Sequence, residues 1–407
     1  MRCNQGKCQA GQTPLSQACR FDEECGSGKC SINSGEIGIC TAVGQVDAGP
    51  PDAALDTSAD APVTKPDASL DAPVTKPDAS LDMRADLVTA RNTVTTFAGT
   101  GSSGKKDAPV ASATFASPSG VAATAGAVFV AQNLGVVRVV RGGAVTSLGS
   151  TDFGDVTDVA VTSNGTIYVA DESKDVIHAI NGTTVTRFAG TGAVGFKNGP
   201  VGSATFANPC GIAVDAAGAV YVADCGNHSI RKISAGQVST LAGSGIGGHN
   251  NGQGTVAQFR EPRGLDLDTS GNVYVADRQN HQIRKITSGG LVSTLAGIWN
   301  NGFPKPGLTD GAATAAQFNN PYDVAVDSPG GVLYVAERVN HRIRKVDLKT
   351  GQTTTAAGSG APSLGKGYFG DGAAAAAGFD NPEGLAFFGG KLYVADRGNN
   401  RVRLYTP

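Results

Sequence analysis

Aromatic and charged side chains are scarce in this 407-residue sequence, which has one Trp and eight Tyr and in which only 17% of the residues are charged. The formal net charge of −2 provides no global field that would attract nucleic acid or a membrane surface. No stretch is long and apolar enough to span a bilayer as a helix, and no apolar segment typical of a signal peptide follows Met1. These absences argue against a transmembrane helix and a nucleic-acid partner.

Glycine, in contrast, is abundant, with 57 residues. The glycines have no three-residue period, which excludes collagen, and the 40% hydrophobic content excludes disorder throughout the chain. Short apolar runs separated by Gly-containing turns are typical of an all-β protein.

Cysteine is rare after residue 40, but the first 40 residues contain six: Cys3, Cys8, Cys19, Cys25, Cys30 and Cys40. Residues 1–46 have few apolar side chains for a core, so we expect a small disulfide-rich module. A zinc site is the alternative, but the segment has no C-x-x-C pair and no His. Disulfides imply an oxidising compartment, so we expect an extracellular or cell-envelope protein whose signal sequence lies upstream. Fifteen disulfide connectivities stay open.

Residues 47–92 are rich in Asp, Pro, Ala and Thr and have nine Asp against four Lys and Arg. The segment APVTKPDASLD occurs at 61–71 and again, identically, at 72–82. With almost no large hydrophobic residues, this region cannot bury enough surface to offset its chain entropy. We therefore predict an extended, acidic, disordered spacer.

A second repeat fills residues 93–407. Its central strand reads VFVAQ (128–132), IYVAD (167–171), VYVAD (220–224 and 273–277), LYVAE (333–337) and LYVAD (392–396). A short apolar strand and a Gly-containing turn precede each copy, and two further strands follow most of them, as in SIRKI and VSTLAG. Four antiparallel strands per repeat of 40–60 residues indicate a six-bladed β-propeller, since neither a β-helix nor a leucine-rich repeat has this pattern.

The phrases FANPCGIAVD…YVADCGNHSIRKI (206–233), FREPRGLDLD…YVADRQNHQIRKI (259–286) and FDNPEGLAF…YVADRGNNRVRL (379–404) resemble the NHL-repeat family. Blade 1 departs from the pattern with Gln132 in place of the carboxylate, and blade 2 has Val156 in place of the proline. The front end, a Cys-rich module with an Asp/Pro spacer, is similar to bacterial cell-envelope proteins. The resemblance implies the fold; family members bind protein or RNA, act as sensors or, less often, catalyse reactions.

Two residue types recur once per blade and could be read as metal ligands. They are the carboxylates Asp171, Asp224, Asp277, Glu337 and Asp396, and the histidines His228, His281 and His341. Equivalent positions of separate blades lie too far apart to share an ion. We therefore interpret both sets as turn residues that hydrogen-bond locally, and we expect no metal and no cofactor.

The residue before each innermost strand should line the mouth of the central channel: Ser119, Thr157, Cys210, Arg263, Tyr322 and Glu383. A metal-dependent lyase or lactonase would place several carboxylate, amide or His ligands there. This ring has one acid, one base and four mixed residues, although Asp266 and Asp268 on the inner strand of blade 4 keep the enzyme alternative open.

The IRKI strands carry a basic repeat, which RNA-binding relatives would use as a basic face. Residues 93–407 have 25 Lys and Arg against 22 Asp and Glu, too small an excess for a phosphate-binding surface. We interpret the basic residues of these strands as solvated strand edges: Arg231, Lys232, Arg284, Lys285, Arg344, Lys345 and Arg403.

Two pairings are expected within the propeller. Blade 6 stops after its third strand, and the missing signature, TVTTFAG, lies ahead of blade 1, so Thr93–Phe97 should pair with Arg401–Tyr405 and close the ring. Cys210 and Cys225 flank the first hairpin of blade 3 at matching distances, so we expect a disulfide between Cα atoms about 4.5–5.5 Å apart; two free, buried thiols are the alternative.

The connections entering blades 5 and 6 are long and carry aromatic residues, which often anchor interfaces. Trp299, Phe303, Tyr322, Tyr368 and Phe369, with Arg263 and Glu383, are therefore the candidate binding residues; packing of these rings within their own loops is the alternative. Because no nucleophile, base and orienting group are assembled, the sequence favours a monomeric, exported or envelope-tethered module that binds a protein or glycan.

Overall fold

The computed structural model describes residues 2–4, 7–9, 91–133, 135–149, 153–300, 302–360 and 367–407. The chain divides into two units, Met1–Ser80 and Leu81–Pro407. In the first, β1 (Arg2–Asn4) and β2 (Lys7–Gln9) pair antiparallel with Cys3 opposite Cys8. The expected disulfide module and the acidic spacer otherwise lie outside the described residues.

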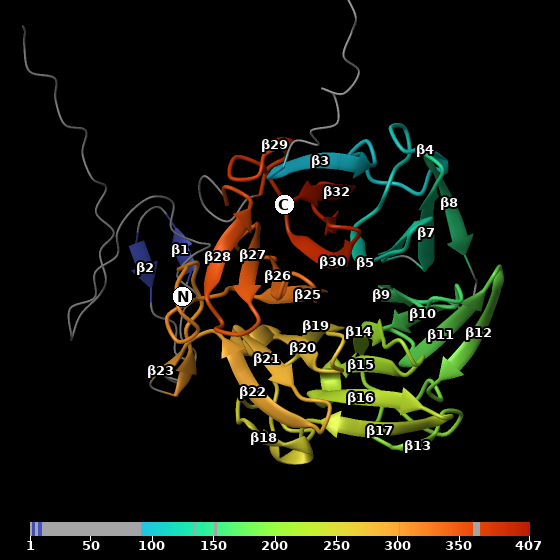
Figure 1. Cartoon of the computed structure of the whole chain (residues 1–407), viewed down its shortest axis with the longest axis vertical. Coiled ribbons are helices and arrows are strands. Elements are labelled where there is room, and N and C mark those ends of the chain that lie inside the picture. The colour runs from blue at the N-terminus through green and yellow to red at the C-terminus, as the bar shows by residue number, and fades with distance from the viewer. Residues whose placement is uncertain are drawn as a thin grey trace, which may run out of the picture. The chain divides into compact units, whose positions relative to one another are not determined.

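The second unit is an all-β propeller of six blades arranged in a ring (Figure 1). Within each blade, four strands run antiparallel from the innermost to the outermost, and the innermost strands of neighbouring blades contact one another.

Blades 1 to 3 share one strand order, from the inner strand outward. Blade 1 is β5 (Pro118–Ala123), β6 (Val128–Gln132), β7 (Val136–Arg141), β8 (Ala144–Gly149) and edge strand β4 (Ala108–Pro109). Blade 2 is β9 (Val156–Val161), β10 (Ile167–Asp171), β11 (Val176–Asn181) and β12 (Thr184–Ala189). Blade 3 is β14 (Pro209–Val214), β15 (Val220–Asp224), β16 (Ser229–Ser234), β17 (Gln237–Ala242) and edge strand β13 (Gly199–Pro200), with the 3-10 turn η2 (Cys225–Asn227).

The other three blades follow the same order. Blade 4 is β19 (Pro262–Leu267), β20 (Val273–Asp277), β21 (Gln282–Ile286), β22 (Leu291–Ala296) and edge strand β18 (Gly252–Gln253), with η3 (Gly254–Val256) and η4 (Arg278–Asn280). Blade 5 is β25 (Pro321–Asp327), β26 (Val332–Glu337), β27 (Arg342–Asp347) and β28 (Thr353–Ala357). Blade 6 is β30 (Pro382–Phe388), β31 (Lys391–Asp396), β32 (Arg401–Thr406), β3 (Thr93–Ala98) and edge strand β29 (Gly372–Ala373). A small hairpin, β23 (Trp299–Asn300) and β24 (Phe303–Pro304), lies in the connection between blades 4 and 5.

The ring is closed by strands from the two ends of the propeller sequence. Strand β3 pairs antiparallel with β32, with Thr93 opposite Thr406 and Val94 opposite Tyr405. In Figure 1 the blue-cyan β3 lies beside the red β32. This is the pairing expected from the TVTTFAG signature, and it removes two open sheet edges.

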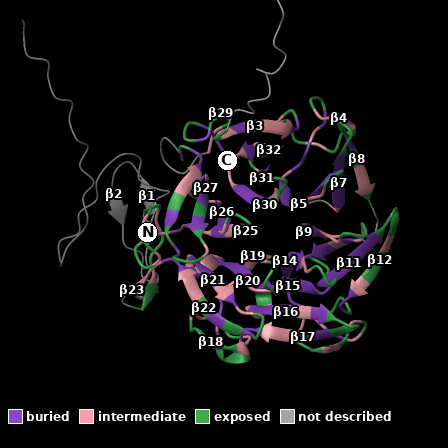
Figure 2. Cartoon of the chain, viewed as in Figure 1, coloured by how far each residue is buried: buried purple, intermediate pink, exposed green. Residues whose placement is uncertain are grey.

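The hydrophobic core consists of clusters between blades. Each of the six clusters found in the described residues joins two neighbouring blades, including blade 6 with blade 1. The Phe of the FxxPxG phrase is fully buried in five blades: Phe115, Phe206, Phe259, Phe318 and Phe379. A blade has two apolar faces, and only its neighbours can cover them, so the inner strands are buried and the connections exposed (Figure 2). Within the described ranges, no helix has the length and hydrophobicity needed to cross a bilayer.

Candidate functional site at the channel mouth

The arginines of the IRKI strands are buried, so the prediction of solvated strand edges was wrong. Arg231, Arg284, Arg344 and Arg403 have no exposed surface, and each pairs with the recurring carboxylate of its blade. The nitrogen–oxygen distances are 2.6 Å for Arg231–Asp224, 2.7 Å for Arg284–Asp277, 2.8 Å for Arg344–Glu337 and 2.7 Å for Arg403–Asp396. The alternation of the strand turns each arginine into the blade interface, while Lys232, Lys285 and Lys345 stay at least partly exposed.

Each buried arginine also packs on the FxxPxG phenylalanine, as Arg284 does on Phe259 at 5.1 Å from guanidinium carbon to ring centroid. The partner carboxylate accepts a backbone N–H as well: Asp277 binds the N–H of Arg260 at 2.8 Å. Burial raises the pKa of Asp224 and Asp396 to about 6 in spite of the paired arginines. The carboxylate row therefore has a structural role, as predicted. In blades 3 to 6 each carboxylate binds the Asn three positions on in its own turn, and it also binds an arginine and a distant backbone N–H. In blade 2, Asp171 accepts the N–H of Lys174 in its own turn and pairs with His178.

The row of histidines joins blades. Nδ1 of His228, His281 and His341 accepts the backbone N–H of Glu261, Asn320 and Asn381, respectively, at 3.0–3.2 Å in the next blade. All three have a left-handed backbone, with φ near 50°. The histidines lie in separate blades and do not converge, as expected for structural turn residues, but they bond to the next blade rather than locally. Among the described residues, no group of three His, Cys, Asp or Glu side chains is placed to hold a metal ion.

Of the six residues predicted at the channel mouth, three are held by a backbone carbonyl or a disulfide. The hydroxyl of Ser119 donates to the carbonyl of Ala131 at 3.3 Å, and that of Thr157 donates to the carbonyl of Cys210 at 2.9 Å. Cys210 is bonded to Cys225 in a disulfide with a Cα–Cα distance of 6.1 Å. This distance exceeds the expected one because a bulge follows Pro209, so the cysteines are not directly opposed.

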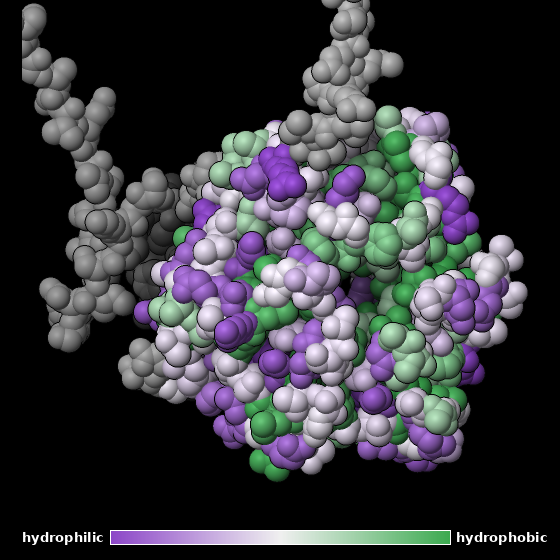
Figure 3. Space-filling view, in the orientation of Figure 1, coloured by the Kyte–Doolittle hydropathy of each residue, from purple (hydrophilic) through white to green (hydrophobic). Residues whose placement is uncertain are grey.

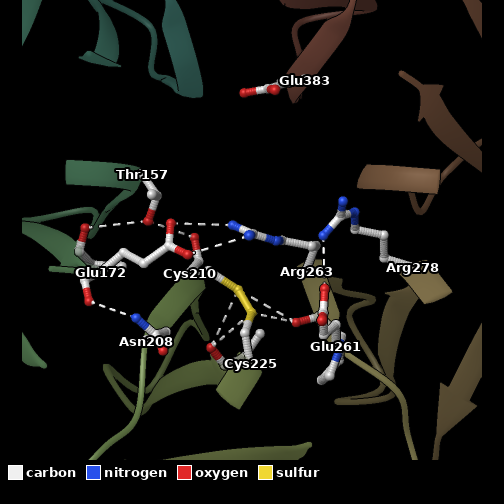
Figure 4. A network of polar contacts seen from close by, with 12 residues as sticks. Thr157, Glu172, Asn208, Cys210, Cys225, Glu261, Arg263, Arg278 and Glu383 are labelled. Atoms are coloured by element: carbon white, nitrogen blue, oxygen red, sulfur yellow. Dashed lines mark hydrogen bonds and ion pairs between the residues drawn. A yellow bond between two sulfur atoms is a disulfide. The ribbon is translucent and has the colours of Figure 1, made fainter. Parts of the chain in front are cut away.

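The other three, Arg263, Tyr322 and Glu383, meet in one network. The guanidinium of Arg263 lies 5.3 Å from the ring centroid of Tyr322 and donates to both oxygens of Glu172, at 3.2 and 3.3 Å. Figure 4 shows Arg263 extended towards Glu172, whereas Glu383 lies apart from both. Glu383, only 1% exposed, pairs with two arginines, one in the turn after β26 and one in the turn after β31.

Those arginines extend the network across blades 5 and 6. Arg338, which follows β26, lies 5.6 Å from the Tyr322 ring and 3.2 Å from Glu383, and Arg397, which follows β31, lies 3.0 Å from the same carboxylate. Burial raises the pKa of Tyr322 to about 12, with a further contribution from Glu383. Burial likewise raises the pKa of Glu383, against the pull of Arg397 and Arg338. The mouth is thus an arginine-rich surface around one half-buried tyrosine.

The remaining aromatic candidates lie apart from this network. Trp299 is half-buried and stacks on His249 with 3.5 Å between ring centroids, whereas Phe303 is 74% exposed. The hydroxyl of Tyr368 donates to the carbonyl of Ala376 at 2.9 Å, so this ring folds back on its own loop. Phe369 lies beneath Arg401, 3.8 Å from guanidinium carbon to ring centroid. No hydrogen bond, ion pair or ring contact described in the structure joins these four side chains to Tyr322.

Sequence reasoning gave little weight to the carboxylates of the inner strands. Asp158, Asp266 and Asp323 are buried or nearly so, and each accepts two backbone N–H groups, one from the following residue and one from an inner strand of another blade. Burial raises the pKa of Asp158 to about 7 and that of Asp266 to about 6, and it raises that of Asp323 as well. Asp268, the other candidate, binds the turn residues Ser270 and Asn272 instead.

On the face seen in Figure 3, hydrophilic and hydrophobic residues are interspersed, and the surface is hollowed near the centre of the ring. On the face that carries the β5–β6 and β9–β10 turns, a cleft of about 800 Å³ lies between blades 1 and 2 and is lined by apolar residues such as Phe129, Val161 and Ile167.

The NHL repeat family matches residues 206–233, 259–286, 318–346 and 379–405, which are blades 3 to 6. NHL repeat-containing protein 2 of Bos taurus is 29% identical over 280 residues, 59% of this chain and 37% of that protein. Protein SUPPRESSOR OF QUENCHING 1, chloroplastic, of Arabidopsis thaliana is 29% identical over 252 residues, 58% of this chain and 23% of that protein. The chain thus spans less than half the length of these relatives.

Among solved structures, an auxiliary nutrient binding protein from Bacteroides thetaiotaomicron has a TM-score of 0.60 at 17% identity, covering 77% of this chain and 75% of that chain. At this identity the likeness concerns the fold alone.

Proposed function

The chain is an NHL-repeat six-bladed β-propeller, and we propose that it is a binding module that holds a protein or glycan partner at the channel mouth. The observation that carries the proposal is the arrangement of Arg263, Arg338 and Arg397 around Tyr322 and Glu383. Arginine and tyrosine are enriched at the centres of binding surfaces, because each combines a large contact area with hydrogen-bonding groups.

The position of this network also supports binding. Arg338 and Arg397 come from turns, whereas Arg263, Tyr322 and Glu383 come from the second position of inner strands. Side chains held by strands have little freedom to lose when a partner docks, so binding costs less entropy than it would on long loops. Phe303, exposed on the hairpin β23–β24, could add an apolar contact at a distance from the mouth.

The setting we propose is outside the cell or in its envelope. The six cysteines of the first 40 residues and the disulfide Cys210–Cys225 are consistent with an oxidising compartment. The acidic segment 47–92 would act as a spacer between an anchor and the propeller.

The test is binding of the full chain to arrayed glycans and proteins, with each hit repeated on two variants. Arg263→Gln with Tyr322→Ala alters the mouth, and Arg141→Gln with Phe388→Ser alters the opposite face, where both residues are exposed. We expect the mouth variant to lose at least tenfold in affinity and the other to bind as the parent does. Equal binding by the mouth variant, or loss only in the opposite-face variant, would refute the assignment.

A further inference from the structure

Two arginines, one from blade 5 and one from blade 6, share one buried carboxylate oxygen. Nε of Arg338 lies 3.2 Å and Nη1 of Arg397 lies 3.0 Å from Oε1 of Glu383. The Glu383 side chain is 1% exposed, and the arginine side chains are 31% and 27% exposed. The single negative charge of Glu383 therefore balances only one of the two guanidinium charges. The other positive charge is left over on the side that faces solvent.

Both guanidinium groups keep N–H donors that nothing in the described chain accepts. Arg338 makes no other ion pair there, and Arg397 uses only Nη1. A guanidinium has five donors in a planar fork that matches the two oxygens of a carboxylate. An anion that approaches from the solvent side would complete the hydrogen bonds of both side chains.

A pocket of about 300 Å³ lies where these donors emerge, between blades 5, 6 and 1. Its lining side chains are polar: Ser103, Ser117, Arg338, Asn381, Arg397 and Asn400. The backbone N–H of Ser117 is held by Asn400 at 3.0 Å, but within the described ranges the hydroxyls of Ser103 and Ser117 have no partner. The pocket thus offers two cations and two uncommitted hydroxyls in a space of roughly monosaccharide size.

Asp380 directly precedes the pocket residue Asn381, and its carboxylate already has partners of its own. It accepts the Asn381 amide at 2.9 Å and lies 3.5 Å from Nδ1 of His341. None of these contacts is with Arg338 or Arg397, so Asp380 does not occupy their free donors.

We propose that this pocket is a carboxylate subsite for an acidic glycan, one uronic acid residue of which places its carboxylate between Arg338 and Arg397. The inference rests on the proposed binding function and specifies its ligand. A glycan is favoured over an acidic peptide because the lining has hydroxyl, amide and guanidinium groups and no apolar side chain to receive peptide side chains. Sugar hydroxyls can pair with Ser103 and Ser117 as the carboxylate binds the arginines.

Calorimetric titration of the full chain with tetragalacturonate tests the proposal, with the fully methyl-esterified tetramer as the matched ligand and tetraglutamate as the peptide. We expect the acid form to bind and the ester, which lacks the charge, to bind at least tenfold more weakly. Equal binding of acid and ester would overturn the inference. Binding of tetraglutamate without tetragalacturonate would overturn the glycan assignment, and so would binding of neither.

Single variants locate the site. Arg338→Gln and Arg397→Gln should each weaken binding of the acid form at least tenfold, and Arg141→Gln, an exposed arginine on the opposite face, should leave it unchanged. Thermal melting first checks that each variant is folded. We expect both to fold, because Glu383 keeps one of its two arginine partners in either variant. Unchanged affinity in both folded variants would overturn the subsite. The proposed function would still stand if the arrays gave a mouth-dependent partner without carboxylates.

Discussion

Nδ1 of His281 in blade 4 accepts the backbone N–H of Asn320 in blade 5 at 3.0 Å, which links two blades through one side chain. In blade 6 the same link is made by Oδ1 of Asn400, which accepts the N–H of Ser117 in blade 1 at 3.0 Å. In blade 2 it is made by Asp175, which accepts the N–H of Asn208 at 2.7 Å. The acceptor changes from blade to blade and the link persists.

This link predicts different outcomes for two substitutions. His281→Ala should lower the free energy of unfolding by about 1–3 kcal/mol, because it leaves the half-buried N–H of Asn320 unpaired and places Ala at a φ of 52°. His281→Asn should cost less than half as much, because Asn tolerates this backbone and accepts the bond in blade 6. Denaturant unfolding measures both values; equal losses would show that the hydrogen bond is not what stabilises this position.

The buried arginines give a second prediction. Arg284→Ala leaves the carboxylate of Asp277 buried without its cation, and such losses cost about 3–5 kcal/mol. Lys285→Ala on the same strand should cost under about 1 kcal/mol, because Lys285 is half-exposed and only covers the Tyr274 ring at 5.6 Å. The comparison uses urea denaturation of both variants, and a similar loss in the two would contradict the assigned roles.

Asp266 predicts a pH dependence. Its folded pKa of about 6 exceeds the unfolded value of about 4, so between these limits the folded state holds the proton more tightly. The contribution of Asp266 to stability is therefore present below about pH 4 and is lost as pH rises through about 6. Relative to Asp266→Asn, the parent should gain about 2 kcal/mol between pH 7 and pH 4, because the unfolded carboxyl is about half protonated at pH 4. A constant difference between the two proteins over this range would refute the shift.

The disulfide in blade 3 closes a loop between positions 15 residues apart. Closing a loop of this length gives about 3 kcal/mol of entropic stabilisation. The gain is smaller when the unfolded hairpin without the disulfide keeps some order. Cys210→Ala with Cys225→Ala should therefore lower stability by about 2–3 kcal/mol, with guanidinium unfolding as the measurement. Mass spectrometry of the unreduced, alkylated protein is the control, and alkylation of both cysteines would exclude the bond.

The sequence was sufficient for the blade count and the closing strand because both depend on a local signature that recurs: the YVAD core and the apolar-Ala-Gly ending. It was insufficient for Arg231, since Arg and Lys look alike in IRKI and only the strand register decides which is turned inward. A usable signal was present: each buried arginine follows its carboxylate by seven positions, as Arg231 follows Asp224.

The contacts at the channel mouth could be recognised only once the blades were placed in the closed ring. Arg263 and Tyr322 lie 59 positions apart and in different blades, so their contact depends on how inner strands are placed around the channel. Ser119, Thr157 and Cys210 occupy equivalent positions, yet nearby carbonyls or a disulfide engage them. The repeat pattern identified the ring of equivalent positions. Only the packing of neighbouring blades shows which side chains join the arginine network and which are held by a carbonyl or a disulfide.

The closing strand also sets an order of events during synthesis. Asn92 and Tyr405, which contact each other beside the closing pair, are 313 positions apart, so β3 leaves the ribosome long before β32 exists. Until then blade 6 lacks its third strand, and β3 has no partner in its own sheet apart from the two-residue β29. The contact with the longest sequence separation is made last, and slow steps of this kind leave strand edges open to other chains. In a nascent chain stalled before Arg401, β3 and β31 would both be strand edges with unpaired backbone groups. Such a chain would be a substrate for chaperones.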